Sequence, residues 1–181
     1  MSLFPDRSGT ALLVVDVQQG VVADAWERDA VVARIAGLVE RARAERVPVV
    51  WVQDEDPGRG TPAWEIVDEL TPIDEEDRVY KRYGDAFEET GLEETLARLG
   101  VDRLVVAGAE TDACIRSTIH GAFTRGYDTE LVSDAHTAVD KSAWGAPPVA
   151  EVVRHTNLYW GFHEGPGRTA GTATAAEVPL R

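Results

Sequence analysis

The segment Ala11-Leu12-Leu13-Val14-Val15-Asp16 decides the fold, because five apolar residues in a row lead directly into a carboxylate. A continuous apolar run of this length is typical of a strand that is buried on both faces of a parallel sheet. Downstream, residues 28–46 carry apolar side chains at helical spacing, and a second short apolar run follows at 49–53. A strand, a helix and a strand in this order predict a parallel βαβ unit.

The rest of the chain continues this alternation of strands and helices. We expect further strands at 78–82, 104–109 and 128–133, and helices at 92–99, 112–125 and 148–159. These elements predict an α/β fold with three α-β-α layers and a Rossmann-like, mostly parallel sheet of five to six strands. We expect a single domain over residues 1–181, in which the tail 165–181 forms a C-terminal arm and residues 178–180 pair on a sheet edge.

Charge and composition narrow the classes of function. The formal net charge of −14 argues against nucleic acid and against anionic membranes as partners, since both require basic patches. No apolar segment reaches the length of about 20 residues that a membrane-spanning helix needs. The single cysteine cannot form an internal disulfide, which fits a cytoplasmic protein and leaves one thiol to explain.

Three polar residues lie where ligands bind in such folds, beyond the carboxyl ends of the strands. Asp16 ends the first strand, Lys81 lies in the third, and Cys114 follows the fourth. Thr111 can cap the helix that begins there, so that the helix dipole would lower the pKa of the Cys114 thiol. Each residue also has an ordinary interpretation, as a turn-forming Asp, a solvent-facing Lys on an edge strand and a buried apolar cysteine. The residues taken singly leave both interpretations open.

Three motifs, taken in order, resemble those of the isochorismatase-like cysteine hydrolases, a family that includes nicotinamidases and N-carbamoyl amide hydrolases. They are Ala11-Leu12-Leu13-Val14-Val15-Asp16-Val17-Gln18, Tyr80-Lys81-Arg82-Tyr83 and Gly108-Ala109-Glu110-Thr111-Asp112-Ala113-Cys114-Ile115-Arg116-Ser117-Thr118. The third motif is specific, and the first two gain weight from their order and spacing. The similarity covers about residues 10–160.

The resemblance implies a catalytic triad of Asp16, Lys81 and Cys114. In such enzymes the carboxylate takes the thiol proton and the thiolate attacks an amide-type carbonyl, while the lysine balances the charge. The carboxylic acid then protonates the leaving amine, and water opens the thioester.

The resemblance also implies a particular backbone around the cysteine. It places a cis peptide bond between Ala109 and Glu110. The backbone N–H groups of Ala113 and Cys114, with that of Glu110, are then the expected oxyanion hole.

One departure from the family concerns metal binding. Nicotinamidases hold a metal with an Asp-x-His pair after the second strand, where this chain reads Asp54-Glu55-Asp56-Pro57, and no histidine occurs from there to Lys81. Asp54 and Asp56 would attract a hard cation only weakly, and the imidazoles that a transition metal prefers are missing. We therefore expect no metal and no cofactor, which counts against a nicotinamidase.

The expected partner is a small-molecule substrate. Trp64, Phe87 and His136 are the candidates for lining its pocket, since such pockets are mostly apolar with a few polar groups. The resemblance implies a homodimer or a higher homo-oligomer.

The leading hypothesis is a metal-free, cysteine-dependent hydrolase of a small amide or carbamoyl substrate. Relatives that cleave a vinyl ether usually lack the cysteine, so Cys114 counts against that reaction. The alternative is a non-catalytic small-molecule binder or a redox sensor on the same scaffold. The Asp16–Lys81 pair separates the two hypotheses, because a sensor does not need it.

Overall fold

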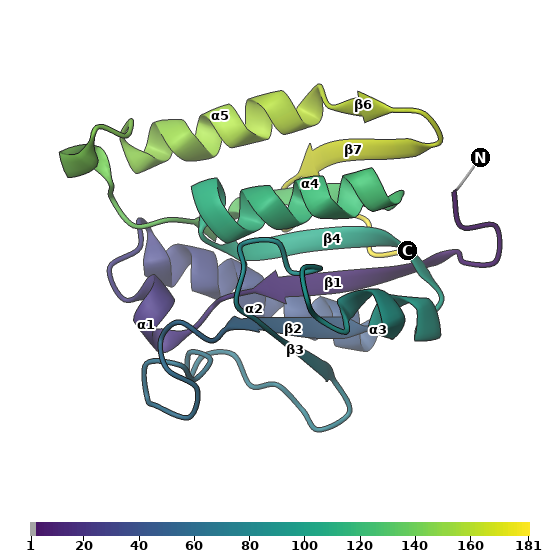
Figure 1. Cartoon of the computed structure of the whole chain (residues 1–181), viewed down its shortest axis with the longest axis horizontal. Helices are drawn as coiled ribbons and strands as arrows, with labels where there is room; N and C mark the ends of the chain where they lie inside the picture. Colours follow the sequence, from purple (N-terminus) through teal and green to yellow (C-terminus); the bar gives the residue numbers. More distant parts are fainter. Residues whose placement is uncertain (1–2) are drawn as a thin grey trace.

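The computed structural model describes residues 3–181, which form a seven-stranded sheet in the order β3-β2-β1-β4-β5-β7-β6 (Figure 1). The strands are β1 (Gly9–Val15), β2 (Val49–Asp54), β3 (Asp77–Lys81), β4 (Val101–Ala109), β5 (Asp128–Thr137), β6 (Glu164–Gly165) and β7 (Arg168–Ala173). Every neighbouring pair is parallel except β6 with β7. The predicted α/β class with a mostly parallel sheet is confirmed.

Helices cover both faces of the sheet. They are α1 (Gln19–Val22), α2 (Arg28–Ala44), α3 (Leu92–Arg98), the π-helical turn η1 (Thr111–Ile115), α4 (Arg116–Arg125), the 3-10 turn η2 (Ser142–Trp144) and α5 (Val149–Gly161). In Figure 1, α2 lies behind the sheet, and α3 and α4 lie in front of it. Among the described residues no helix is long and apolar enough to cross a membrane.

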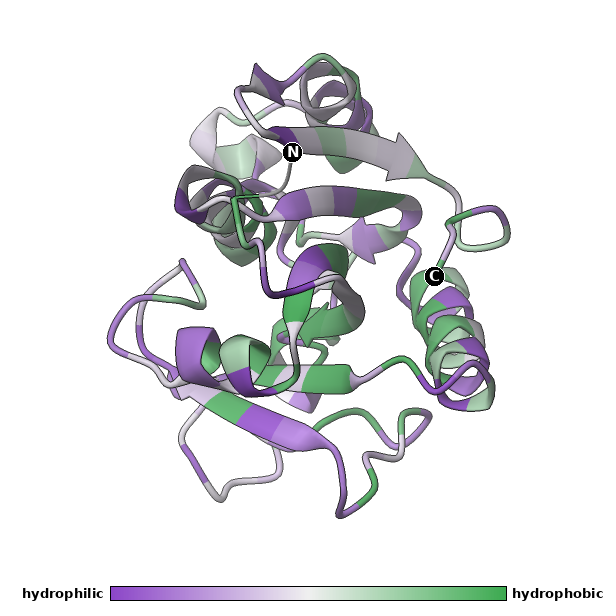
Figure 2. Cartoon of the chain, turned by 90° about the vertical axis from the view of Figure 1, so that its right-hand side faces the viewer, coloured by the Kyte–Doolittle hydropathy of each residue, from purple (hydrophilic) through white to green (hydrophobic). Residues whose placement is uncertain are grey.

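The strands form because their side chains are buried on both faces. Residues 11–15 of β1 are at most 1% exposed. Alternate residues of the strands enter two separate cores, one against α2 and one against α3 and α4. Apolar residues accordingly gather on the strands and on the helix sides that face them, whereas the outer loops are more polar (Figure 2).

The C-terminal tail is built into this domain. Residues 178–180, which we expected to pair on a sheet edge, form no strand, and the tail joins the sheet through β7 instead, which lies between β5 and β6 and pairs in parallel with β5. Val178 and Leu180 are each 2% exposed and pack into the core beside α2. The guanidinium of Arg41 donates hydrogen bonds to the carbonyls of Ala175, Ala176 and Val178. The sheet thus has seven strands instead of the expected five to six. The additional strands were not expected because β6 and β7 lack the apolar run that identifies the inner strands.

The order in which the chain adds strands to the sheet reverses between β1 and β4, although the two strands are parallel. The chain passes from β1 outward through β2 and β3, and then returns to place β4 on the other side of β1. Gly108 lets these two strands approach closely, since a Cβ there would lie 2.0 Å from the Val15 carbonyl oxygen. Its φ of 129° also favours glycine. Ligands bind at such a reversal in open α/β sheets.

Candidate active site

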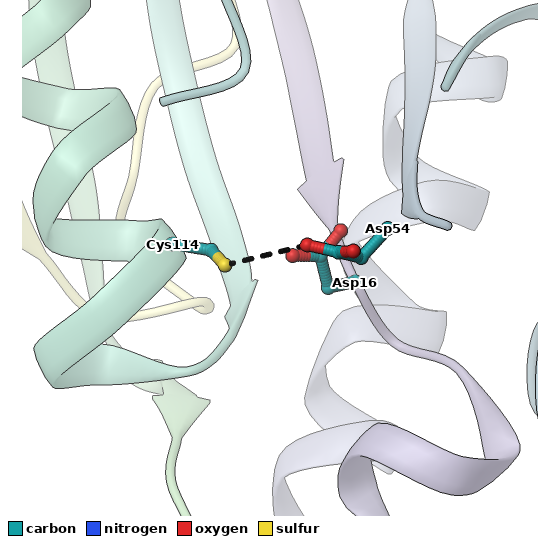
Figure 3. Close-up of side chains that lie close together, drawn as sticks. All are labelled: Asp16, Asp54 and Cys114. Carbon is teal, nitrogen blue, oxygen red and sulfur yellow. Dashed lines mark hydrogen bonds between the residues drawn. The ribbon is translucent and has the colours of Figure 1, made fainter. Parts of the chain in front are cut away.

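Four polar side chains meet at the ends of four neighbouring strands. Lys81 ends β3, Asp54 ends β2, Asp16 follows β1, and Cys114 lies in η1 after β4. Because the strands are parallel, their carboxyl ends meet at one edge of the sheet. Figure 3 shows the Cys114 thiol pointing toward the carboxylates of Asp16 and Asp54.

The ammonium group of Lys81 lies at the centre of this cluster. Its Nζ is 2.8 Å from Asp16 Oδ2, 2.5 Å from Asp54 Oδ2 and 3.2 Å from Cys114 Sγ. One oxygen of Asp16, one of Asp54 and the Cys114 sulfur all lie within 4.8 Å of one another. The structure therefore brings together the three residues of the predicted triad.

Asp16 occupies an unfavourable position in two respects. Its φ of 52° lies in the left-handed region, which costs a residue other than glycine about 1–3 kcal/mol. It is also only 1% exposed. Pairing with Lys81 and a backbone hydrogen bond from its N–H to the Val52 carbonyl hold it there. Strain of this kind is a common feature of functional sites.

Burial sets the proton affinities of the cluster. Desolvation raises the pKa of Asp16 to about 6, although the charge of Lys81 opposes the rise. Desolvation and the charge of Asp16 raise the pKa of the Cys114 thiol to about 12, and Lys81 offsets only part of this. Burial opposes the charge of Lys81, but the negative charges of Asp16 and Cys114 outweigh it and raise the lysine pKa. At neutral pH the resting thiol is thus protonated beside an ionised carboxylate.

This protonated thiol corrects one expectation from the sequence. We expected the helix dipole to lower the pKa of Cys114, but the pKa is raised because the thiol is buried next to a carboxylate. The expected cap is also wrong. Glu110, not Thr111, precedes the helical turn, and no side chain caps it. The hydroxyl of Thr111 lies instead 2.9 Å from His136 Nδ1.

The turn η1 carries Cys114, the predicted nucleophile, and we call it the nucleophile turn; its backbone bears on the expected oxyanion hole. The peptide bond between Ala109 and Glu110 is cis, where the resemblance placed it. The N–H of Ala113 donates to the Glu110 carbonyl over 3.0 Å, and that of Ile115 donates to the same oxygen over 3.1 Å. Ala113 is therefore already hydrogen-bonded, whereas this carbonyl receives no bond from Cys114. Cys114 and Glu110 stay the candidates for holding an oxyanion.

Acidic side chains of this turn anchor a neighbouring loop. Lys141 Nζ lies 3.2 Å from Glu110 Oε2 and 2.7 Å from Asp112 Oδ1. The other carboxylate oxygen of Glu110 accepts the N–H of Val139 over 3.0 Å. The segment after β5 is thereby held against the nucleophile turn.

Asp54 joins the cluster although the sequence does not predict it as a member of the triad. The sequence predicts it only as a weak ligand of a hard cation, together with Asp56. Its carboxylate instead contacts Lys81, and its Oδ2 lies 4.0 Å from the Cys114 sulfur. Like Asp16, Asp54 lies at the end of an apolar strand, and this position in the sequence could have indicated that it lies at the site.

The three expected pocket residues lie in different places. Trp64 packs against Tyr80 with ring centroids 5.5 Å apart and ring planes tilted by 41°, and the guanidinium of Arg59 lies 5.9 Å from the centroid of the Trp64 ring. Phe87 is 7% exposed and belongs to the core on the α3 and α4 side.

His136 is an interior residue that links three elements. It is 1% exposed, and its two ring nitrogens contact the Thr111 hydroxyl and, over 3.0 Å, the Asn157 side-chain oxygen. Burial lowers its pKa, so the ring is neutral. That His136 lines the substrate pocket stays a prediction, and in this structure both of its ring nitrogens are engaged inside the protein.

The cluster does not fit a metal ion. Asp16, Asp54 and Cys114 have a spacing that could hold one. However, the Lys81 ammonium contacts all three side chains and already supplies the positive charge at their centre. A metal would have to displace this buried cation, and no imidazole is among the three ligands.

A mostly parallel sheet whose strand order reverses between β1 and β4, with a thiol, an ammonium and two carboxylates at its strand ends, is an arrangement that matches the isochorismatase-like fold. The chain belongs to the isochorismatase family, since the model of the Isochorismatase domain matches residues 10–146.

Two relatives and one solved structure are similar to this chain over most of its length. A streptothricin hydrolase of Streptomyces noursei is 37% identical over 156 residues, which are 81% of this chain and 61% of that protein. A ureidoacrylate amidohydrolase of Methylobacterium radiotolerans is 30% identical and covers 72% of this chain and 67% of its own length. A solved isochorismatase structure from Pseudomonas putida has a TM-score of 0.83 at 26% identity, over 94% of this chain and 90% of that one. The chain thus spans less than two thirds of the first of these relatives.

Proposed function

We propose that the chain hydrolyses a C–N bond in a small amide or carbamoyl compound through a thioester on Cys114. The observation that carries the proposal is a protonated thiol within 4.8 Å of a carboxylate whose pKa is about 6. A thiol with a raised pKa needs a base to become nucleophilic, and Asp16 is ionised at neutral pH. Relatives named as a hydrolase and an amidohydrolase support the same class of reaction.

The reaction has two halves, formation and hydrolysis of the thioester, and Asp16 carries one proton in each of them. As the Cys114 sulfur bonds to the substrate carbonyl carbon, its proton passes to the Asp16 carboxylate. Backbone N–H groups of the nucleophile turn stabilise the oxyanion, and the Asp16 acid then protonates the leaving nitrogen as the C–N bond breaks. A water molecule attacks the thioester, gives one proton to Asp16 and releases the acid, and the thiolate recovers that proton.

Lys81 and Asp54 set the charge of the site. Lys81 stabilises the thiolate as it forms, since its Nζ lies 3.2 Å from the sulfur. With both carboxylates ionised, two negative charges and one positive charge leave a net charge of −1 around a neutral thiol. This charge disfavours an anionic group at the reacting centre and favours a neutral or cationic substrate.

The raised thiol pKa counts against the alternative of a redox sensor. Sensor cysteines are oxidised as thiolates and therefore have low pKa values. The pKa of Cys114 is about 12, so little resting thiolate is present at neutral pH.

Ammonia release from a panel of amides, ureas and carbamoyl compounds tests the proposal. Wild type should release ammonia from at least one compound, and Cys114→Ser should not. Brief exposure to the active compound should add the acyl mass to Cys114 in acid-quenched wild type. The exposed Asp56→Asn variant is the control and should retain turnover. Full activity in Cys114→Ser would refute the proposed mechanism.

A further inference from the structure

Thr111 begins the nucleophile turn, three residues before Cys114. A threonine hydroxyl at the start of a helical turn commonly accepts the backbone N–H two or three residues further along the chain. The N–H of Cys114 is also a candidate for holding the oxyanion. An N–H that is bonded to a hydroxyl must lose that bond before it can bind an oxyanion. A Thr111 side chain that capped the turn would therefore oppose the proposed reaction.

In this structure the Thr111 hydroxyl is directed elsewhere. Its one hydrogen bond within residues 3–181 is to His136 Nδ1, over 2.9 Å, and no side chain caps the turn. Thr111 is 0% exposed and His136 is 1% exposed. Because a buried polar group without a partner is costly, each of these side chains needs the other. The contact therefore fixes the direction in which the hydroxyl points.

The side chain of Asn157 decides which nitrogen of His136 carries the proton. Asn157 Nδ2 donates to the Ser133 carbonyl over 2.8 Å, which turns its Oδ1 toward the His136 ring. Oδ1 can only accept, so His136 Nε2, which lies 3.0 Å away, must carry a hydrogen. Burial lowers the pKa of His136, so the ring is neutral and has no second proton. Nδ1 is thus an acceptor, and the Thr111 hydroxyl donates to it.

We propose that His136 is a positioning residue, whose Nε2–H tautomer holds the Thr111 hydroxyl away from the Cys114 N–H and keeps that N–H available for an oxyanion. A chain of hydrogen bonds runs from Thr111 through His136 and Asn157 to the Ser133 carbonyl, so β5 and α5 orient a hydroxyl in the nucleophile turn. The effect on rate rests on the proposed hydrolysis, whereas the tautomer and the hydrogen bonds belong to the resting protein.

A matched pair of His136 variants tests this role in the compound from which wild type releases ammonia. His136→Gln places an amide near the position of Nε2 and keeps a partner for Asn157, but it removes the acceptor of the Thr111 hydroxyl. That hydroxyl should then cap the Cys114 N–H and lower kcat by about 2- to 30-fold, which is the strength of such a cap. KM should stay unchanged, because the oxyanion forms only after binding. The control His136→Asn places an acceptor near Nδ1 and should keep a kcat close to that of wild type.

Removal of the hydroxyl distinguishes positioning from a merely structural role. Thr111→Val keeps the shape of the side chain but has nothing to occupy the Cys114 N–H, so its kcat should match that of wild type. Combined with His136→Gln, it should restore the kcat that His136→Gln alone loses. A structural role predicts the opposite, since a second change in the same buried contact would add to the damage. A double variant no faster than His136→Gln would overturn the proposal.

Two NMR measurements test the same hydrogen bond without a substrate. In wild type whose histidines carry the heavy nitrogen isotope, His136 should show a protonated Nε2 and an unprotonated Nδ1. Exchange of the Cys114 amide hydrogen should slow by about 2- to 30-fold in His136→Gln and return to the wild-type rate when Thr111→Val is added.

A protonated Nδ1 would overturn the proposal, as would an unchanged exchange rate in His136→Gln. The tautomer is measured in wild type, so it decides even where a variant fails to fold. Neither NMR measurement depends on turnover. Correct NMR results with no compound hydrolysed would refute the proposed reaction and leave the positioning of Thr111 intact.

Discussion

Replacing Asp54 by Asn should shift the pH dependence of Cys114 reactivity toward acid. The change removes one of the two carboxylates that flank Lys81 and keeps the shape of the side chain. The negative charge of Asp54 is one cause of the raised pKa of Asp16, so its loss should lower that pKa. Lys81 would also be left to pair with Asp16 alone, which acts in the same direction.

The size of this shift follows from the spacing of the two carboxylates. Their nearest oxygens lie within 4.8 Å, so their repulsion is about 0.9 kcal/mol in a water-like medium and about 3.5 kcal/mol at an effective dielectric constant of 20. Lys81 lies between the two groups and screens them, which favours the lower part of this range. At about 1.4 kcal/mol per pKa unit, we expect the pKa of Asp16 to fall from about 6 to about 5.

Alkylation of the single cysteine by iodoacetamide measures this shift without a known substrate. Its rate, followed by mass spectrometry, should rise with pH through about 6 in wild type, because ionised Asp16 accepts the thiol proton. The rise in Asp54→Asn should be centred about one unit lower. Asp56→Asn removes an exposed carboxylate two residues away and should leave the profile unchanged. A profile that stays in place or moves to higher pH in Asp54→Asn would refute the reasoning.

Three further predictions concern other parts of the molecule. In Asp16→Asn, the alkylation rate should lose its rise near pH 6. The folded pKa of Asp16 is about 6 and lies above the unfolded value of 3.8, so wild type should lose about 3 kcal/mol of stability relative to the variant as the pH rises from 4 to 6. Urea titrations at each pH would measure this loss. Gly108→Ala should destabilise the fold by about 4 kcal/mol or more, because its Cβ would meet the Val15 carbonyl, whereas Gly37→Ala, with open space inside α2, should add about 1 kcal/mol of stability in the same titrations. Arg41→Ala should expose the tail near Val178 to proteases and lower the melting temperature by several degrees, and an unchanged cleavage pattern would contradict its anchoring role.

The inner strands could be predicted from sequence because burial on both faces leaves a local signature. Uninterrupted apolar runs at 11–15, 49–52 and 104–109 form most of β1, β2 and β4, and the order of these strands fixes where Asp16 and Cys114 meet. Strand β7 has no such signature. Its sequence, Arg-Thr-Ala-Gly-Thr-Ala, is small and polar, and its pairing with β5 depends on distant contacts.

The electrostatics of the site could not be predicted in the same way. The position of Cys114 at a helix start suggested an acidic thiol, but burial beside Asp16 outweighs that effect. The roles of Asp54 and His136 depend on which side chains meet them in space. No local pattern reveals that Lys81 is shared between two carboxylates, or that both nitrogens of His136 are engaged.

The distribution of the site over four strands has a consequence for how activity is lost. Lys81, Asp54, Asp16 and Cys114 each depend on a different neighbouring strand, so fraying of any one of β1 to β4 separates at least one group from the others. A site on one flexible loop can fail while the domain stays folded, because local opening costs less than global unfolding. Here three of the four groups depend on strands inside the sheet, which open only with the whole domain, so their separation should follow the cooperative unfolding curve, and only fraying of the edge strand β3, which carries Lys81, would precede it. The chemistry of this chain would then report directly on the integrity of its sheet.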